Sequence, residues 1–389
     1  MKRFIYSAAS AGTESIKAGL SRCRKGRHTL MRKNMALQQI RAREQAASRR
    51  PRLADVARLA EVSLGSASRA LSIPHAVKPQ TLHRVRAAAE KLGYLPDGAA
   101  RALAMGRSQT VGVVLPTVNN PIYADFVHAL QKQLADGGYY LLISAHEYDR
   151  AQERAQVERL LERGVDGLIL VGTGQDAALL SRLERAGRPY LFTWSLDEAE
   201  GRASVGFSNR RAIQPVVRHL LELGHRRFAV LSGDPMRNER ARGRIVGIRE
   251  TLAEAGIELP VDRVFTAPFT IEAAREAFRL AMGLSPRPTA LICTADLLAA
   301  GALAQARDAG IAVPKRLSIT GMDNIEFSAL LTPQLTTIDV PTDEIGRRAA
   351  DSMLAALKQG APLESWEVET RLLVRASTAP PPKNNMVRN

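Results

Sequence analysis

Two patterns of apolar residues divide the chain. Between residues 51 and 97, apolar positions recur at helical spacing in three short segments. From Thr110 onward, short apolar runs alternate with longer amphipathic stretches. The first pattern predicts three small helices, and the second predicts strands alternating with helices, as in parallel sheets built from βαβ units.

The second of the three small helices has a polar outer face. Ser63 is placed to cap its N-terminus, because a hydroxyl can accept from the free backbone N–H groups of a first turn. Ala67 and Leu71 point back toward the first helix, and a third helix over residues 79–92 ends at Gly93, a residue suited to a C-cap. The outer face keeps Ser66, Ser68 and Arg69, as a helix entering a DNA major groove requires.

The alternating region predicts a series of buried strands. They lie at 111–115, 140–143, 167–171, 190–194, 227–231, near 263–266, 289–293 and 317–320. Helices are expected between them, among others at 123–137, 151–163 and 209–223. Open sheets of this kind bind ligands beyond the carboxyl ends of their strands, so residues that follow these strands are candidate ligand contacts.

The segment 51–108 resembles the DNA-binding headpiece of the LacI/GalR family of bacterial transcription regulators. The resemblance lies in Asp55-Val56-Ala57, Val62-Ser63, Ser68-Arg69, 94–97 and 100–103. It continues over about 110–375, in Asn120-Pro121, 164–167, 223–226, 288–290, 296–301, Asp323-Asn324 and 335–338. It implies an all-α helix-turn-helix headpiece followed by a periplasmic-binding-protein-like α/β domain, with two Rossmann-like lobes and a ligand in the cleft between them.

The expected organisation has five parts. They are a basic arm at 1–50, a helix-turn-helix domain at 51–97, a hinge at 98–108, an effector-binding and dimerisation domain at 109–379, and a tail at 380–389. One lobe should comprise 110–206 plus 339–360, and the other 207–336 plus the final strand.

Charge separates the DNA-binding region from the rest. Residues 1–50 carry 13 Lys and Arg against two acidic residues, residues 51–108 carry 9 against 4, and the remaining 281 carry 33 of each. The net charge of +16 therefore lies in the first 108 residues, which is typical of phosphate contact. Met31 and Met35 precede the family-like segment, so an upstream extension from a mis-assigned start is favoured over a functional arm.

Composition excludes several other classes of protein. No run of about 18 apolar residues predicts a membrane span, and the N-terminus lacks the apolar core of a signal peptide. Cys23 and Cys293 form neither a disulfide framework nor a metal-ligand spacing. A cytoplasmic protein without a cofactor is expected.

The resemblance assigns a set of DNA contacts. On the recognition helix these are Ser63, Leu64, Gly65, Ser66, Ser68 and Arg69, and in the hinge they are Arg101 and Leu103. The hinge is too short to be a stable helix alone, so it should order when two hinges meet on DNA. Leu103 would then enter the minor groove and kink it, unless it only packs against its dimer mate.

Four positions depart from the family pattern, and two of them, Leu64 and Gly65, lie early in the recognition helix where many relatives carry larger polar or aromatic side chains. Arg52 stands where a Thr or Ser usually caps the first helix, which costs around 1 kcal/mol. Glu61 replaces a common Gly in the turn, where φ is often positive. Gly65 cannot hydrogen-bond a base edge, so base contacts at that part of the helix rest on its neighbours.

Candidate ligand contacts lie at the expected strand ends. They are Asn120, Tyr123, Trp194, Arg244, Phe269 and Asp296. By resemblance, Arg244 and Asp296 match the Arg and Asp that hydrogen-bond effectors, and such a pair facing each other suits a polyhydroxylated ligand. The alternatives are a surface ion pair for Arg244 among Arg240 and Arg242, a helix cap for Asp296, and plain packing for Trp194.

The segment Gly172–Ala177 is a degenerate dinucleotide-binding fingerprint, with Asp197 about twenty residues on. It follows the third strand of its lobe, where such a fingerprint belongs after the first. The glycines are better explained by a tight strand-to-helix turn near the cleft.

The sequence thus predicts a ligand-responsive transcription regulator, a repressor that acts as a homodimer. Each headpiece would bind half of a near-palindromic double-stranded operator, and a sugar or sugar acid in the cleft would change DNA affinity. A solute-binding protein of a transport system would carry a signal peptide and no headpiece. An enzyme would need a catalytic set, a metal cluster or a phosphate loop, and the sequence has none in a suitable context.

Overall fold

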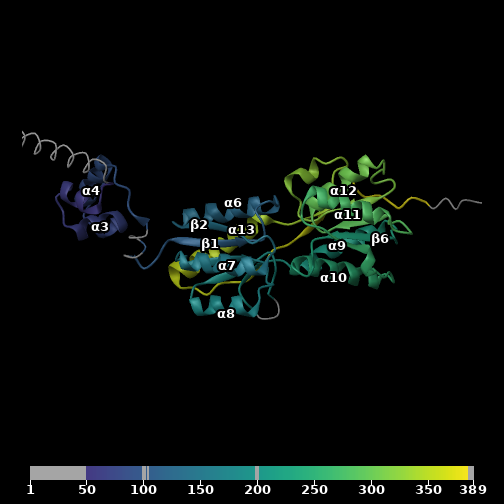
Figure 1. Ribbon diagram of the computed structural model, residues 1–389, viewed down its shortest axis with the longest axis horizontal. Helices are drawn as coiled ribbons and strands as arrows, with labels where there is room; N and C mark the ends of the chain where they lie inside the picture. The colour runs from purple at the N-terminus through teal and green to yellow at the C-terminus, as the bar shows by residue number, and fades with distance from the viewer. Residues whose placement is uncertain (1–49, 99–101, 103–104, 198–200, 384–389) are drawn as a thin grey trace, which may run out of the picture. The chain divides into compact units, whose positions relative to one another are not determined.

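The computed structural model describes residues 50–98, 102, 105–197 and 201–383. The chain forms two compact units, one up to residue 101 and one from residue 102 onward. Figure 1 shows helices in the first unit and strands with helices in the second, and each unit has its own hydrophobic core.

Over residues 50–98, the part of the first unit that the structure describes, the chain forms three helices and a short 3-10 turn. Their bounds are α2 Leu53–Leu59, α3 Leu64–Ser72, η1 Pro74–Ala76 and α4 Pro79–Leu92. The helices enclose a small core formed mainly by Val56, Ala67 and Val85, all fully buried. Gly93 ends α4 with φ of 62°, a left-handed conformation that glycine adopts without strain. The predicted helix over 79–92 is confirmed.

The two departures from the family pattern near α2 have visible structural consequences. Arg52 is the N-cap residue of α2, and the carboxylate of Asp55 accepts a hydrogen bond from its backbone N–H at 3.0 Å. This bond satisfies one donor of the helix end, whereas a guanidinium has no acceptor to offer the others. Glu61 adopts φ of 53°, so the turn does use the left-handed conformation that a glycine would adopt more easily.

The first lobe of the second unit is built on a six-stranded parallel sheet. In the order in which they pair, the strands are β11 Trp366–Glu367, β5 Ser204–Gly206, β4 Tyr190–Thr193, β3 Gly167–Val171, β1 Thr110–Leu115 and β2 Tyr140–Ala145. Helices α6 Ile122–Asp136 and α13 Thr342–Gln359 pack against each other, and α7 Arg150–Glu162 and α8 Ala177–Ala186 complete the lobe (Figure 1). The first strand lies between the second and the third, which is a doubly wound topology.

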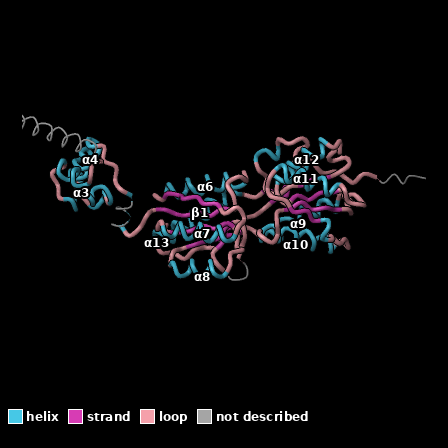
Figure 2. The backbone as a smooth tube through the Cα atoms, viewed as in Figure 1, coloured by secondary structure: helices cyan, strands magenta, loops and turns pink. Residues whose placement is uncertain are grey.

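The second lobe repeats this plan with four parallel strands. In pairing order they are β7 Val264–Thr266, β6 Phe228–Ser232, β8 Ala290–Cys293 and β9 Ser318–Thr320. Helices α9 Asn209–Glu222 and α10 Glu239–Glu254 pack together, as do α11 Ile271–Met282 and α12 Asp296–Asp308. Figure 2 shows the strands of this lobe between these two pairs of helices. Two 3-10 turns, η2 Val261–Arg263 and η3 Glu326–Ala329, complete the lobe. The predicted two-lobed α/β fold is confirmed.

The chain crosses between the lobes three times. Two of the crossings contain β10 Thr337–Asp339 and β12 Arg371–Leu373, which pair antiparallel as a separate two-stranded sheet. The final strand was predicted to belong to the second lobe, but β12 pairs with β10 in the connection between the lobes. The residues after β12 do join the second lobe, where the Ser377 carbonyl accepts from the backbone N–H of Ile319. The strand β11, which extends the first sheet, was not predicted, because both of its residues are exposed and carry no alternating pattern.

Candidate functional site

In the first unit, α3 presents the face that the sequence predicts for DNA contact. Ser63 caps the helix, since its hydroxyl accepts from Ser66 N–H at 3.1 Å. Leu64 is 55% exposed, and Gly65 and Arg69 are also exposed. The Arg69 guanidinium donates to the Gly65 carbonyl at 3.4 Å, so it lies along the first turns of the helix.

Opposite this face, Ala67 and Ala70 are fully buried in the core of the unit. Ser66 and Ser68 are half-buried. The apolar and exposed faces of α3 therefore separate as its sequence predicts. The two remaining predicted DNA contacts, Arg101 and Leu103, lie outside the described residues.

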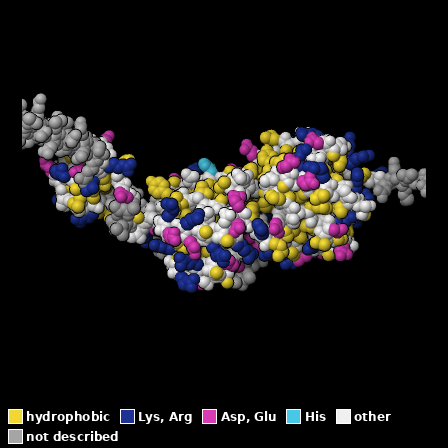
Figure 3. Space-filling model, in the orientation of Figure 1, with side chains coloured by type: hydrophobic (Ala, Val, Ile, Leu, Met, Phe, Trp, Pro, Cys, Tyr) yellow, Lys and Arg dark blue, Asp and Glu magenta, His cyan; other side chains and the backbone are white. Residues whose placement is uncertain are grey.

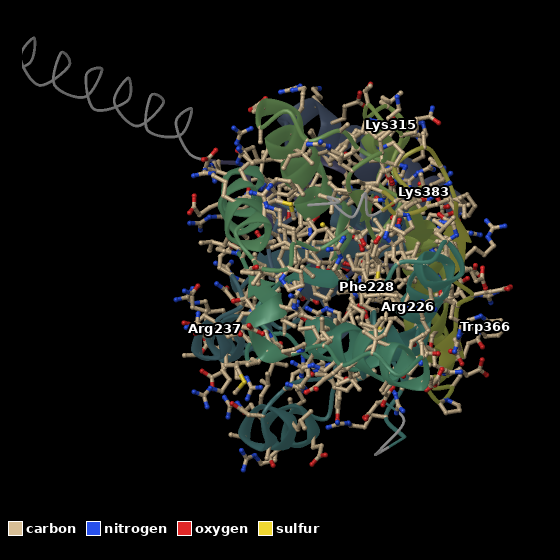
Figure 4. The ribbon with its side chains drawn as sticks, turned by 90° about the vertical axis from the view of Figure 1, so that its right-hand side faces the viewer. Arg226, Phe228, Arg237, Lys315, Trp366 and Lys383 are labelled. Carbon is tan, nitrogen blue, oxygen red and sulfur yellow. The ribbon has the colours of Figure 1, made fainter. Side chains whose placement is uncertain are left out.

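In the second unit, the carboxyl ends of the strands of both lobes border a cleft. Its inner end is a cavity of about 20 Å³, just large enough for one water molecule. A wider outer pocket of about 460 Å³ adjoins it and shares Tyr148, Asn238 and Phe269 with it. The outer pocket is by itself large enough for an ordinary small-molecule site, whereas the inner cavity is not. Arg237, which lines this pocket, is labelled in Figure 4.

Five of the six predicted ligand contacts line the inner cavity. They are Asn120, Tyr123, Trp194, Arg244 and Phe269. Tyr123 packs edge-on against Trp194 with ring centroids 5.1 Å apart. Phe269 of the second lobe meets Tyr148 of the first at 5.6 Å, so an aromatic ring from each lobe borders the passage from the outer pocket to the inner cavity.

Trp194 combines packing with an unused polar group. The side chain is 2% exposed, and its backbone has φ of 70°, an uncommon conformation for a residue other than glycine. Its indole N–H has no hydrogen-bond partner among the described residues. Buried donors are nearly always paired, so an acceptor in the cavity would complete this site. Backbone strain of this kind is concentrated at functional sites.

Arg244 is held in a buried polar network. It donates from Nε to Asn209 Oδ1 at 2.8 Å and from Nη1 to the Thr294 carbonyl at 2.5 Å, and Asp323 Oδ1 lies 3.9 Å from Nη1. Because both Arg244 and Arg240 are buried, the alternative of a surface ion pair for Arg244 does not hold.

The carboxylate that faces Arg244 in the structure belongs to Asp323, whereas the sequence predicted Asp296 in that place. Asp296 is fully buried at the start of α12, where its oxygens accept from Ile325 N–H at 3.1 Å and from the Thr337 hydroxyl at 2.5 Å. It therefore fixes the turn after β9 and does not line the cavity. The signal that could have found Asp323 was its place in the family-like Asp-Asn pair, of which both residues have positive φ.

Burial controls the electrostatics of these carboxylates. It raises the pKa of Asp323, and the Arg244 guanidinium offsets only part of that rise. Burial likewise raises the pKa of Asp296. The hydrogen bonds that it accepts from the Thr337 hydroxyl and from backbone N–H groups lower this pKa in part. A buried carboxylate that is easily neutralised can switch from acceptor to donor, which suits recognition of hydroxyl groups.

Comparison with known proteins accords with this arrangement. Residues 52–97 match the model of the lacI family of bacterial regulatory proteins, and residues 217–378 match the periplasmic binding protein-like domain. The chain is 31% identical over 326 residues to the HTH-type transcriptional repressor CytR of Escherichia coli K12, covering 83% of this chain and 95% of the relative. The chain belongs to the LacI family.

Solved structures of the family extend over both units. The lac repressor dimer bound to operator and an anti-inducer is similar with a TM-score of 0.75 and 26% identity, over 85% of this chain and 100% of that one. The complex of the regulator CelR with cellobiose has a TM-score of 0.63 and 28% identity, over 84% and 100%.

Membership in the LacI family makes this chain a DNA-binding transcriptional repressor that responds to an effector, and not an enzyme. Within the described residues, no group of His, Cys, Asp and Glu is arranged to hold a metal ion. None of the described helices is long and apolar enough to cross a membrane.

Proposed function

We propose that this LacI-family repressor binds its operator as a homodimer through α3 and responds to a sugar or sugar acid in the cleft. The observation that carries the effector class is the pairing of Arg244 with Asp323 beside Trp194 and three further aromatic rings. A guanidinium and a carboxylate offer donors and acceptors to neighbouring hydroxyl groups, and flat rings pack on the apolar face of a sugar.

The size of the cleft and a relative support the same class. The outer pocket of about 460 Å³ accommodates a ligand that reaches with one end toward the inner cavity. The CelR relative is described in complex with cellobiose, a sugar.

The homodimer is supported by an apolar strand at the edge of the first sheet. On β2, Tyr140 is 68% exposed, Leu142 38% and Ile143 48%. Exposed apolar side chains on an edge strand are a liability unless another surface covers them. A second copy of the chain is the proposed cover, as in the lac repressor relative, which is described as a dimer.

A thermal-shift screen of neutral sugars and sugar acids against the full-length protein tests the effector class. A ligand at 100 times its Kd should add about 2.7 kcal/mol to the stability of the second unit. Arg244→Ala and Asp323→Asn should each abolish the shift, because a partner left unpaired in a closed cleft costs about 3–5 kcal/mol.

Arg242→Ala is the matched control for this screen. Arg242 lies on the same helix, but its side chain is exposed and donates to the Pro235 carbonyl, outside the Arg244–Asp323 pair. The variant should respond like the wild type. A full shift with Arg244→Ala, or no shift with any sugar or sugar acid, contradicts the proposed effector class.

A further inference from the structure

The loop that follows β3 contacts the opposite lobe. Gly172 has φ of 89°, and a Cβ atom at this position would collide with the Arg240 guanidinium at the start of α10. A Cβ atom on Gly174 would lie 3.0 Å from Glu239 Oε2. Glycine at 172 thus permits both an uncommon backbone conformation and the close approach of two charged side chains from the second lobe.

These two side chains are hydrogen-bonded across the cleft. Glu239 Oε1 accepts from the Thr173 backbone N–H at 3.1 Å and from the Ser195 hydroxyl at 3.2 Å. Arg240 donates to Glu239 Oε1 at 2.9 Å and to the Val171 carbonyl at 3.3 Å. The acceptors and donors on the first lobe all follow or end strands β3 and β4, at the edge of the sheet that faces the cleft.

Both side chains of this contact are largely buried. The side chain of Arg240 is 7% exposed and that of Glu239 is 17% exposed. Burial alone would raise the pKa of Glu239, but the Arg240 guanidinium and the hydrogen bonds from Thr173 and Ser195 bring it below its usual value. The carboxylate therefore stays ionised at neutral pH. A charge that is removed from water is stabilised by its ion-pair and hydrogen-bond partners, so losing one of them is costly.

We propose that Glu239 and Arg240, seated on residues 172–174, form an interlobe clasp that holds the cleft closed. Arg240 also lines the inner cavity, so Glu239 acts as a positioning residue that fixes this guanidinium in the cavity wall. Opening of the clasp would separate the lobes and admit a ligand to the inner cavity. Only its regulatory consequence rests on the proposed function, because the contacts themselves involve neither ligand nor DNA.

Trp194 provides a direct measure of whether the cleft is closed. It lies between residues of both lobes in the wall of the inner cavity and is 2% exposed. The chain has two tryptophans, and the other, Trp366, lies under the Arg348 guanidinium, 3.5 Å from its ring centroid. Figure 4 labels Trp366 on the side of the molecule opposite Arg237, which lines the outer pocket. In the full-length Trp366→Phe protein, acrylamide quenching of fluorescence therefore measures the accessibility of Trp194 alone.

In this single-tryptophan protein, Glu239→Ala and Arg240→Ala should raise the quenching constant well above that of the parent. Loss of a hydrogen bond to a charged group corresponds to a shift of about 10- to 100-fold in the ratio of open to closed lobes. Glu239→Gln should give an intermediate value, because an amide oxygen can still accept from Thr173 and Ser195 but lacks the charge that attracts Arg240.

Glu250→Ala is the matched control for loss of a carboxylate. Glu250 pairs with Arg210 at 2.6 Å, and both residues belong to the second lobe. The variant removes an ion pair without touching the interlobe clasp, so its quenching constant should equal that of the parent.

A second pair of variants tests the clasp from the first lobe. Gly172→Ala should open the cleft by the collision with Arg240, and Gly187→Ala should not. Gly187 has φ of 61° in the same lobe, but a Cβ atom added there would have no neighbouring atom within 4 Å. Both substitutions strain the backbone, so a difference in quenching between them measures the interlobe contact.

Unchanged quenching in both Glu239→Ala and Gly172→Ala, with near-ultraviolet circular dichroism like that of the parent, overturns the clasp. If Glu239→Ala does not fold, Glu239→Gln and Gly172→Ala decide the question by the same measurement. None of these experiments uses a sugar or an operator. A failed clasp therefore leaves the effector proposal intact, and a failed sugar screen leaves the clasp intact.

Discussion

Arg69 is the exposed cation on α3 that is best placed to contact a base edge. Its guanidinium lies beside the Gly65 carbonyl, and Gly65 itself presents no side chain that could compete for the same base. Ser63, by contrast, already uses its hydroxyl to cap the helix. Arg69 should therefore contribute mainly to DNA affinity, and Ser63 should also contribute to the stability of the first unit.

We expect Arg69→Ala to weaken operator binding by about 1–3 kcal/mol and to relax specificity at one base pair. A gel-shift titration at fixed salt against the operator and single-base variants of it measures both effects. Arg249→Ala, which removes an exposed arginine from the second unit, is the control and should bind like the wild type. Equal operator affinity for Arg69→Ala and wild type would remove Arg69 from the DNA-binding surface.

At the scale of elements, the segment 98–108 is the predicted hinge, and the structure describes the contacts of its last residues. Arg107 anchors its end to the first lobe, since its guanidinium donates to the Leu357 carbonyl at 2.8 Å near the end of α13. The backbone N–H groups of Ser108 and Gln109 donate to the Asp166 carboxylate at 3.1 and 2.8 Å. We therefore expect the last residues of the predicted hinge to move with the first lobe.

The resemblance to the family assigns Leu103 of this hinge to the minor groove at the operator centre. Leu103→Ala should lower specific affinity and DNA bending together, because an apolar wedge offsets the cost of unstacking a base step. Non-specific binding should change little. A circular-permutation bending assay on the operator, with Leu330→Ala as an exposed leucine control in the second unit, makes this measurement. Full bending of the operator by Leu103→Ala would show that Leu103 does not kink the DNA and that the hinge only connects the two units.

At the scale of the whole molecule, net positive charge is confined to the N-terminal region, and the region from residue 109 onward is neutral. The 281 residues from 109 onward carry equal numbers of acidic and basic side chains. Figure 3 shows both signs interspersed over the second unit. The positive charge that attracts phosphate therefore belongs to the DNA-binding end, and the ligand-binding unit adds no net field of its own.

A chain that begins at Met35 tests how much of this charge serves operator recognition. It lacks nine Lys and Arg and one Glu relative to the full sequence. Its preference among operator variants should be unchanged, whereas its affinity for unrelated DNA should fall and depend less steeply on salt. Filter binding at several salt concentrations measures both quantities. A changed base preference would show that the arm takes part in recognition.

The sequence by itself determined the classes of element and their order. The helices of the first unit and the alternating strands and helices of the second follow from short-range periodicity, which each segment carries within its own residues. Ser63 and Gly93 could be assigned as helix caps for the same reason, because a cap depends on a few neighbouring residues. The family motifs then identified the fold and the class of function.

Only the tertiary structure decided which side chains meet in the cleft. Asp296 and Asp323 both follow strands of the second lobe, and the choice between them depends on how the turn after β9 packs on α12. The role proposed for Gly172 depends on Arg240, which approaches it from the other lobe, and the neighbouring Thr173 bonds to Glu239, 66 positions away in the sequence. Contacts of this kind arise from the docking of two lobes, and no local pattern of apolar and polar residues encodes which distant side chain arrives at a given strand end.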